Sequence, residues 1–138
     1  MGALDGLSVL LLEDEFLIAL EAEDMLTRMG AARIEIAQDL EEAGRLLGEH
    51  RFDIAMLDVN VNGQTSLGLA ADLKERGIPV LFATGYELKS KSIPADDSIP
   101  YITKPYSADR LESALVSALS STNPPPPTVF PEKSAKRA

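Results

Sequence analysis

The sequence predicts an α/β fold built on a five-stranded, doubly wound parallel sheet, and three observations support this prediction. Short apolar runs recur along the chain, each with the length of a strand that is buried on both faces. Stretches with the helical spacing of apolar residues separate these runs, and the connections between them are short. Strict alternation of strand and helix is typical of a parallel sheet with helices on both faces. The expected strands are residues 8–12, 34–37, 54–57, 80–83 and, more weakly, 101–103.

Most of the expected helices have a recognisable start or end. Gly30 follows the first helix where a C-terminal cap is expected, and Asp39 with Glu42 resembles a capping box that opens the second. Ser107 is placed to cap the last helix. The residues that these helices are expected to bury are Ile18, Ala22, Met25 and Met29 in the first, Leu40, Ala43 and Leu47 in the second, Leu67, Ala70 or Ala71, and Leu73 in the third, and Leu111, Leu115, Ala118 and Leu119 in the last.

The chain is expected to form one domain, residues 1–122, with a short tail. Residues 85–100 give only a weak helical pattern, which Pro94 and Pro100 interrupt, so we expect a weak fourth helix there. Residues 123–138 begin with four consecutive prolines after Asn123 and are expected to be extended at first and then disordered. A length of 138 residues, 45% of them hydrophobic, suits a single core.

The composition narrows the class of protein. The chain has no cysteine, which excludes disulfides and thiolate metal sites, and it has no apolar run near the roughly 20 residues of a membrane span. The formal net charge is -9, and the tail carries three basic residues and one acid, so residues 1–122 carry -11. Such an acidic body repels phosphate backbones. We therefore expect a cytoplasmic protein that binds neither nucleic acid nor a membrane.

Chemically useful side chains follow the expected strands at the point where each strand ends. In open α/β sheets, ligands bind outside the carboxyl ends of the strands, so these residues are expected to converge at one edge. Taken alone, the first two acids are explained equally well by favourable negative charge at a helix N-terminus. The residues are Glu13 and Asp14 after the first strand, Asp58 after the third, Thr84 and Gly85 after the fourth, and Lys104 after the fifth.

The three acids predict a magnesium site. Carboxylates that are crowded together resist ionisation unless a cation neutralises them, and oxygen ligands without His or Cys nearby select magnesium or calcium. Magnesium fits better because it needs only one or two direct carboxylates and keeps several waters. Asp14 and Asp58 are the expected direct ligands, and Glu13 is expected to act through water.

Asp58 is also the best candidate for a covalent phosphoryl acceptor. A carboxylate beside magnesium can attack phosphorus and form an aspartyl phosphate. The transferred group spreads negative charge over its oxygens, and the Lys104 ammonium, the Thr84 hydroxyl and the Gly85 backbone N–H are expected to hold them.

This ordered set of residues resembles the receiver domain of a two-component response regulator. The resemblance covers residues 7–120 and rests on the acidic pair, the acid after the third strand, the threonine after the fourth and the Lys104-Pro105 dipeptide. It implies a flavodoxin-like (βα)5 receiver fold, a histidine kinase as phosphoryl donor, and no enzymatic activity beyond the domain's own phosphorylation and dephosphorylation. The residue roles that it implies are phosphorylation of Asp58, magnesium held by Asp14, Asp58 and the backbone carbonyl of Asn60, and phosphoryl contacts from Thr84 and Lys104.

A narrower resemblance concerns the stretch Phe82-Ala-Thr-Gly-Tyr86, which is similar to the signature of the FAT GUY receivers. These are typically stand-alone regulators of α-proteobacteria that work with HWE-type histidine kinases. In receivers generally a switch aromatic lies three residues before the lysine, which here is Tyr101, whereas the FAT GUY pattern leaves Tyr86 as the other candidate. The usual Pro-Gly loop after the phosphorylation site is replaced by Asn60-Val-Asn-Gly63.

Other functions stay open from the residues alone. The chain is also compatible with a pseudo-receiver scaffold that works without phosphorylation, and with a phosphate sink that competes for a kinase. A magnesium-dependent phosphatase is disfavoured, because it usually needs a second acid two residues after the nucleophile, where Asn60 stands. Residues 123–138 are too few for a DNA-binding module, so we expect signalling through contacts with another protein. We also expect a monomer, because the surface through which the resemblance permits dimerisation contains the irregular segment 85–100.

Overall fold

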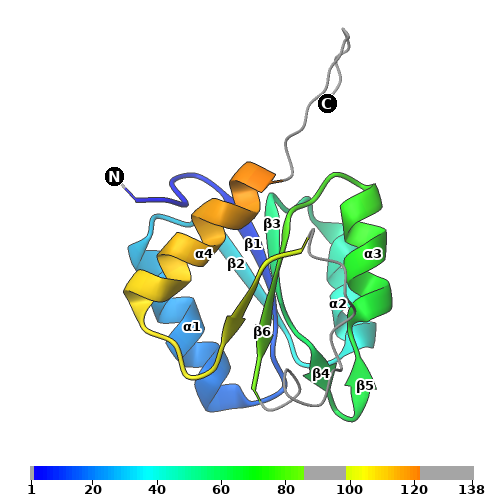
Figure 1. Ribbon diagram of the computed structural model, residues 1–138. Coiled ribbons are helices and arrows are strands. Elements are labelled where there is room, and N and C mark those ends of the chain that lie inside the picture. Colours follow the sequence, from blue (N-terminus) through cyan, green and yellow to red (C-terminus); the bar gives the residue numbers. More distant parts are fainter. Residues whose placement is uncertain (1, 86–98, 122–138) are drawn as a thin grey trace, which may run out of the picture.

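The computed structural model describes residues 2–85 and 99–121, and in these residues the predicted five-stranded parallel sheet is confirmed. The strands lie in the order β2-β1-β3-β6-β7, and all neighbours in the sheet run parallel (Figure 1). The strands of this sheet are β1 (Ser8–Leu12), β2 (Arg33–Ala37), β3 (Ile54–Asp58), β6 (Val80–Thr84) and β7 (Tyr101–Thr103), and the helices are α1 (Phe16–Arg28), α2 (Leu40–Glu49), α3 (Leu67–Glu75) and α4 (Ala108–Ser121).

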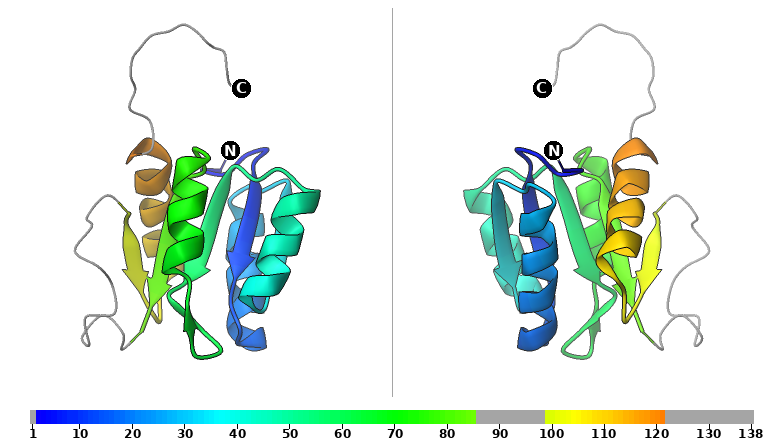
Figure 2. Two further views of the ribbon diagram at one scale, coloured as in Figure 1. Left: turned by 90° about the vertical axis from the view of Figure 1, so that its right-hand side faces the viewer. Right: turned by 90° about the vertical axis from the view of Figure 1, so that its left-hand side faces the viewer.

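Helices cover both faces of the sheet, as the alternating pattern predicts. Figure 2 shows α2 and α3 on one face and α1 and α4 on the other. Successive residues of a strand point to opposite faces. Val9 and Leu11 of β1 therefore pack in the cluster under α1 and α4, while Leu10 and Leu12 pack in the cluster under α2 and α3. Both sets are buried, which explains why the strands are continuous apolar runs.

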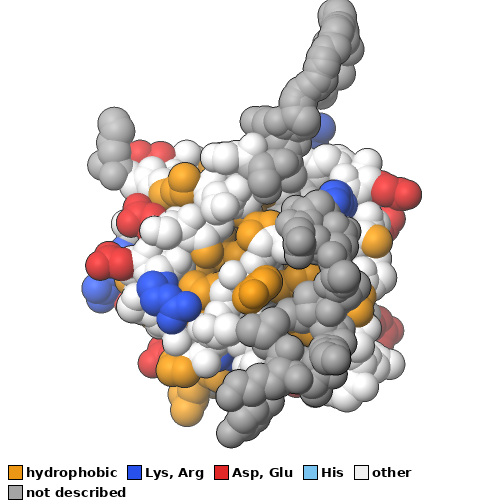
Figure 3. Space-filling model, in the orientation of Figure 1, with side chains coloured by type: hydrophobic (Ala, Val, Ile, Leu, Met, Phe, Trp, Pro, Cys, Tyr) orange, Lys and Arg blue, Asp and Glu red, His pale blue; other side chains and the backbone are white. Residues whose placement is uncertain are grey.

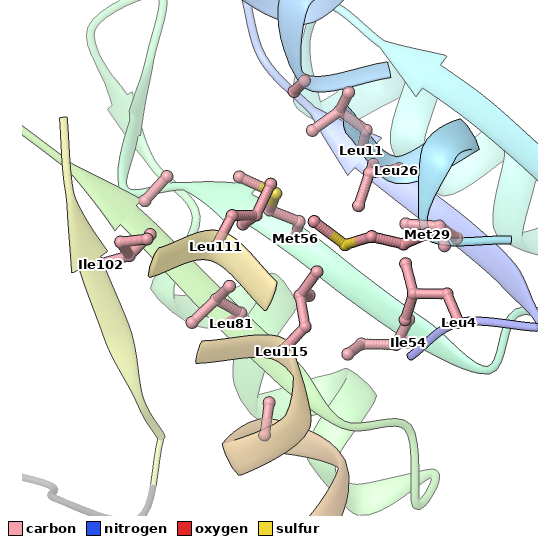
Figure 4. Packing of buried hydrophobic residues seen from close by; sticks show 14 of the residues in the cluster. Leu4, Leu11, Leu26, Met29, Ile54, Met56, Leu81, Ile102, Leu111 and Leu115 are labelled. Atoms are coloured by element: carbon pink, nitrogen blue, oxygen red, sulfur yellow. The ribbon is translucent and has the colours of Figure 1, made fainter. Parts of the chain in front are cut away.

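The cluster under α1 and α4 is a closely packed apolar layer. Leu11 and Met56 come from adjacent strands, and Leu111 and Leu115 reach them from α4 (Figure 4). Leu4 is fully buried in the same cluster, and its backbone N–H donates to the carbonyl of Met29 at 2.9 Å. The segment before β1 therefore closes the amino edge of this layer, a contact that its sequence did not indicate.

The helix caps that the sequence predicts are present. Gly30 has a φ of 99°, and a side chain there would collide with Asp5, so this position requires glycine. The Asp39 carboxylate accepts the backbone N–H of Glu42 at 2.7 Å, and the Ser107 hydroxyl accepts that of Arg110 at 3.2 Å.

The buried stripes of two helices differ in detail from the predicted ones. In α1 the buried residues include Ala19 and Leu26, whereas Ile18 and Met25 are only half buried. In α2 the fully buried pair is Ala43 and Leu46, with Leu40 and Leu47 at the margin of the cluster. The helical spacing was predicted correctly. Apolar residues lie next to one another along both helices, however, so the sequence does not determine which of them faces the sheet.

A small antiparallel hairpin follows β3, and it was not predicted. Its strands are β4 (Asn60–Val61) and β5 (Gln64–Thr65), which pair with each other and not with the main sheet. The two turn residues, Asn62 and Gly63, have φ values of 53° and 81°. An Asn-Gly pair with both φ values positive is the favoured two-residue hairpin turn.

Two predicted features lie largely or wholly outside the described residues, namely the weak helix within 85–100 and the tail at 123–138. Within residues 2–85 and 99–121, no helix is long and apolar enough to cross a membrane.

Candidate functional site

The strand register brings the predicted site residues to one edge of the sheet, which is the lower edge in Figure 1. Leu12 pairs with Leu57, so Glu13 and Asp58 follow at neighbouring positions. Asp58 pairs with Ala83, and Thr84 pairs with Thr103. Among the described residues, all four buried polar or charged side chains lie at this edge, and they are Glu13, Asp58, Ser66 and Thr84. Burial of this kind costs free energy unless each group finds partners.

Three carboxylates meet at the centre of the edge. One oxygen of each of Glu13, Asp14 and Asp58 lies within 4.8 Å of the others. Glu13 and Asp58 are only 3% and 5% exposed, and Asp14 is half buried. A cluster of hard oxygen ligands without histidine or cysteine suits a magnesium or calcium ion. The cluster can therefore hold a metal ion, as the sequence predicted.

Lys104 places its ammonium group within the acidic cluster. Its Nζ lies 2.9 Å from Glu13 Oε1 and 3.1 Å from Asp58 Oδ2. The backbone N–H of Lys104 donates to the carbonyl of Thr84 at 2.8 Å, which fixes where the side chain leaves the main chain. The peptide bond from Lys104 to Pro105 is cis. Convergence of lysine and acids was predicted, but the Glu13 ion pair was not.

Burial controls the ionisation of the central carboxylate. It raises the pKa of Asp58 to about 7, with the nearby Lys104 charge opposing the rise and Glu13 and Asp14 adding to it. Burial also acts to lower the pKa of Lys104, but the hydrogen bond to Glu13 and the charge of Asp58 outweigh it, so the net pKa of this amine is raised. The three carboxylates thus outnumber the one ammonium group among them.

Hydrogen bonds that involve backbone groups also fix the acidic residues. Glu13 Oε2 accepts the backbone N–H of Glu15 at 3.1 Å, and Asp14 Oδ2 accepts that of Asn62 at 2.9 Å. The Ser66 hydroxyl donates to the backbone carbonyl of Asp58 at 2.6 Å. These contacts fix the carboxylates of Glu13 and Asp14 and the main chain at Asp58, although the three negative charges repel one another.

The remaining predicted residues lie around this centre. Thr84 is fully buried, Gly85 follows it, and Asn60 is half buried in β4. Tyr101 lies on β7 with 49% of its surface exposed. Tyr86 lies outside the described residues, so the choice between Tyr101 and Tyr86 as switch aromatic stays a prediction.

Sequence reasoning missed two residues near the cluster. Ser66 carries no local signal beyond its place before α3, and only its 2.6 Å bond to Asp58 reveals its part in the site. Tyr106 is half buried, and burial, with a smaller contribution from Glu13, raises the pKa of its phenol to about 12. Its position two residues after Lys104 gave no sign of this environment.

A doubly wound parallel sheet that gathers three acids and a lysine at its carboxyl edge defines a class of signalling domains, the receivers of two-component systems. The chain belongs to this family, since the model of the response regulator receiver domain matches residues 9–116. It is therefore a receiver domain of the two-component response regulators.

Known proteins agree with this assignment. The sensory transduction protein LytT of Bacillus subtilis is 30% identical over 112 residues, which are 79% of this chain and 46% of that protein. The chain spans about half the length of the curated relatives it matches. The solution structure of SdrG from Sphingomonas melonis Fr1 is 29% identical, with a TM-score of 0.65, and the match covers 88% of this chain and 98% of that one. The anti-anti-sigma factor PhyR from Bartonella quintana is 25% identical, with a TM-score of 0.70, over 83% of this chain and 49% of that one.

Proposed function

We propose that this receiver is a phosphorylation-controlled switch in which Asp58 accepts a phosphoryl group from a histidine kinase. The observation that carries the proposal is the setting of Asp58. Its carboxylate is almost fully buried, two further acids lie within 4.8 Å, and the Lys104 ammonium lies 3.1 Å away. A buried carboxylate beside two further acids and a lysine is typical of a functional site, because maintaining its charge there costs stability.

Mg2+ is the proposed cofactor. Asp14, Asp58 and the backbone carbonyl of Asn60 are the proposed direct ligands, and Glu13 acts through water. The oxygen-only donor set and its crowding support this choice. When bound, the ion supplies positive charge to the phosphoryl oxygens.

The proposed reaction moves one phosphoryl group. An Asp58 oxygen attacks the phosphorus of a phosphohistidine, the P–N bond breaks, and the imidazole leaves with that electron pair and takes a proton from water. The Lys104 ammonium moves from the acids to the phosphoryl oxygens, where the Thr84 hydroxyl and the Gly85 N–H also donate. Water later hydrolyses the acyl phosphate and releases inorganic phosphate. The chain catalyses only these two reactions on itself.

The output is a change of protein contacts. The new charge draws the Thr84 hydroxyl and the Lys104 ammonium toward the phosphoryl oxygens, and Tyr101 or Tyr86 follows. Partners that prefer one state then shift the balance between the two. The Phe82–Tyr86 stretch supports a place in the FAT GUY group with an HWE-type kinase. The likeness to an anti-anti-sigma factor supports a protein partner. The domain is proposed to be cytoplasmic and monomeric.

The start of α1 is the proposed docking surface for the phosphorylated kinase. Phe16 and Leu17 are 60% and 74% exposed, and they directly follow the acids at 13–15. Figure 3 shows exposed hydrophobic side chains at the lower end of the molecule, where α1 begins. A phosphohistidine must reach Asp58 across this edge, so apolar residues beside it are well placed to bind the donor.

Intact-mass analysis after incubation with a small-molecule phosphodonor tests the acceptor. The wild-type protein should gain one phosphoryl group only when Mg2+ is present, and Asp58→Asn should gain none. Asp24→Asn is the matched control, because Asp24 is an exposed acid of α1 paired with Arg28, and it should label normally. Undiminished labelling of Asp58→Asn would refute the assignment. A folded wild-type protein that binds Mg2+ but takes no label, even from a phosphorylated kinase, would favour the scaffold function.

A second comparison tests the docking surface. Leu17→Ser should slow phosphotransfer from a phosphorylated HWE-type kinase several-fold, while labelling by the small donor stays unchanged. Val116→Ser removes a hydrophobic side chain of α4 that is also exposed, at 46%, and should leave both rates unchanged. Equal transfer to both variants would exclude α1 as the docking surface.

A further inference from the structure

The β4–β5 hairpin contacts the acidic cluster directly. Its turn residue Asn62 donates its backbone N–H to Asp14 Oδ2 at 2.9 Å, a contact between residues 48 positions apart in the chain. Figures 1 and 2 show the hairpin at the lower edge, where β3 leaves the sheet. Asn62 is the first of the two turn residues and has a positive φ of 53°. Asparagine is one of the few residues that adopts this conformation readily.

The tip of the hairpin is also tied to the start of α2. The Asn62 side-chain amide donates to the carbonyl of Gln38 at 3.3 Å. Gln38 is itself held, because its N–H donates to Glu42 Oε1 at 2.9 Å within the capping arrangement of α2. Asn62 therefore lies between a fixed helix end and the Asp14 carboxylate.

The base of the hairpin is fixed to the end of β3. Ser66 is fully buried, its hydroxyl donates to the carbonyl of Asp58, and its N–H donates to the carbonyl of Val59 at 2.8 Å. With both ends fixed, the turn has little freedom to move away from Asp14. The two other acids, Glu13 and Asp58, are held instead by Lys104.

We propose that Asn62 is a positioning residue whose backbone amide orients Asp14 for the divalent cation. This inference rests on the proposed function, in which the cluster binds Mg2+. A hydrogen bond to one carboxylate oxygen fixes the rotation of the group, so the cation finds its ligand already oriented. The turn conformation of Asn62, not its side chain, is the property that matters for Asp14.

Two substitutions separate the backbone from the side chain. Asn62→Gly removes the bond to Gln38 but keeps the N–H and favours positive φ, whereas Asn62→Val keeps the N–H but opposes positive φ. Mg2+ affinity is measured by calorimetry in the absence of phosphodonor, and the residue 62 amide is followed by NMR hydrogen exchange. Urea denaturation confirms that both variants are folded under these conditions.

The Val variant should bind Mg2+ roughly three- to ten-fold more weakly and lose protection of the residue 62 amide, while the Gly variant stays within about two-fold of wild type and keeps that protection. Equal Mg2+ affinity of the two variants, whether both are near wild type or both are weak, would overturn the inference. Failure of the wild-type protein to bind Mg2+ at all would refute the proposed function together with this inference, which is a distinct result.

Discussion

Leu57 and Asp58 are consecutive residues of β3, and their exposed fractions are 0% and 5%. Leu57 packs between apolar side chains, so its burial removes hydrocarbon from water and stabilises the fold. Asp58 is buried at the carboxyl edge, where burial raises its pKa to about 7 and opposes its charge. One residue of the strand therefore favours folding, and the next, the proposed phosphoryl acceptor, lowers stability.

The largest effect on stability is expected in the apolar body of the strand. Leu57→Ala removes a fully buried side chain and leaves a cavity, so the free energy of unfolding should fall by about 3 kcal/mol in a urea denaturation. Leu17→Ala is the matched control, because its side chain is 74% exposed, and its effect should stay near or below about 0.5 kcal/mol. Similar losses at the two positions would contradict the described packing of β3.

Substitution of the next residue, Asp58, is expected to raise the free energy of unfolding instead of lowering it. The pKa of Asp58 is 3.8 ordinarily and about 7 in the fold, so the folded state binds more protons between these values. The stability linked to Asp58 is thus full below pH 3.8 and is lost as the pH rises through 7. Without divalent cations, Asp58→Asn should therefore be more stable than wild type at pH 8. The difference should vanish near pH 3.5, and a less stable variant at pH 8 would contradict the pKa.

Addition of metal sharpens the same comparison. The proposed Mg2+ site exists only in the folded state, so an ion concentration of ten times its Kd should add about 1.4 kcal/mol to the stability of wild type. Leu57→Ala keeps the three acids and should gain as much, whereas Asp58→Asn should gain much less. Thermal unfolding with and without the ion measures this. An equal gain for all three proteins would mean that the ion binds elsewhere.

The smallest effect is expected for an acid at the same edge that has a structural role. Asp39 caps α2 and lies outside the acidic cluster, so Asp39→Ala should cost about 1 kcal/mol of unfolding free energy. Asp39→Asn keeps a capping oxygen and should cost little. Both variants should keep Mg2+ affinity within about two-fold of wild type. A large loss of affinity in Asp39→Asn would show that its charge belongs to the site.

Much of the fold follows from local pattern. The buried runs, the helical spacing and the caps at Asp39 and Ser107 are local signals, and the structure contains each of them. Which side of α2 faces the sheet is harder to predict. Leu46 and Leu47 are adjacent leucines, and only packing against the sheet determines that Leu46 faces inward. The Asn62-Gly63 pair is itself a local signal for the hairpin, because both residues readily adopt the positive φ that its turn requires.

The site was predictable to the extent that topology alone brings residues together. Parallel strands end at one edge, so Glu13, Asp58 and Lys104 had to meet there. Which acid the Lys104 ammonium contacts depends on side-chain directions, so the ion pair with Glu13 is visible only in the structure. Bonds between distant backbone groups and side chains, such as Asn62 to Asp14, likewise leave no pattern in the sequence.

The Lys104 ammonium among the acids sets the charge balance of the edge. When Glu13, Asp14 and Asp58 are ionised, three negative charges and one positive charge leave the cluster at -2. One divalent cation would make it neutral, and the proposed phosphoryl group would make it negative again. In the proposed cycle each step thus changes the local charge by a defined amount, so the phosphorylated state differs from the resting state in its electric field as well as in its shape.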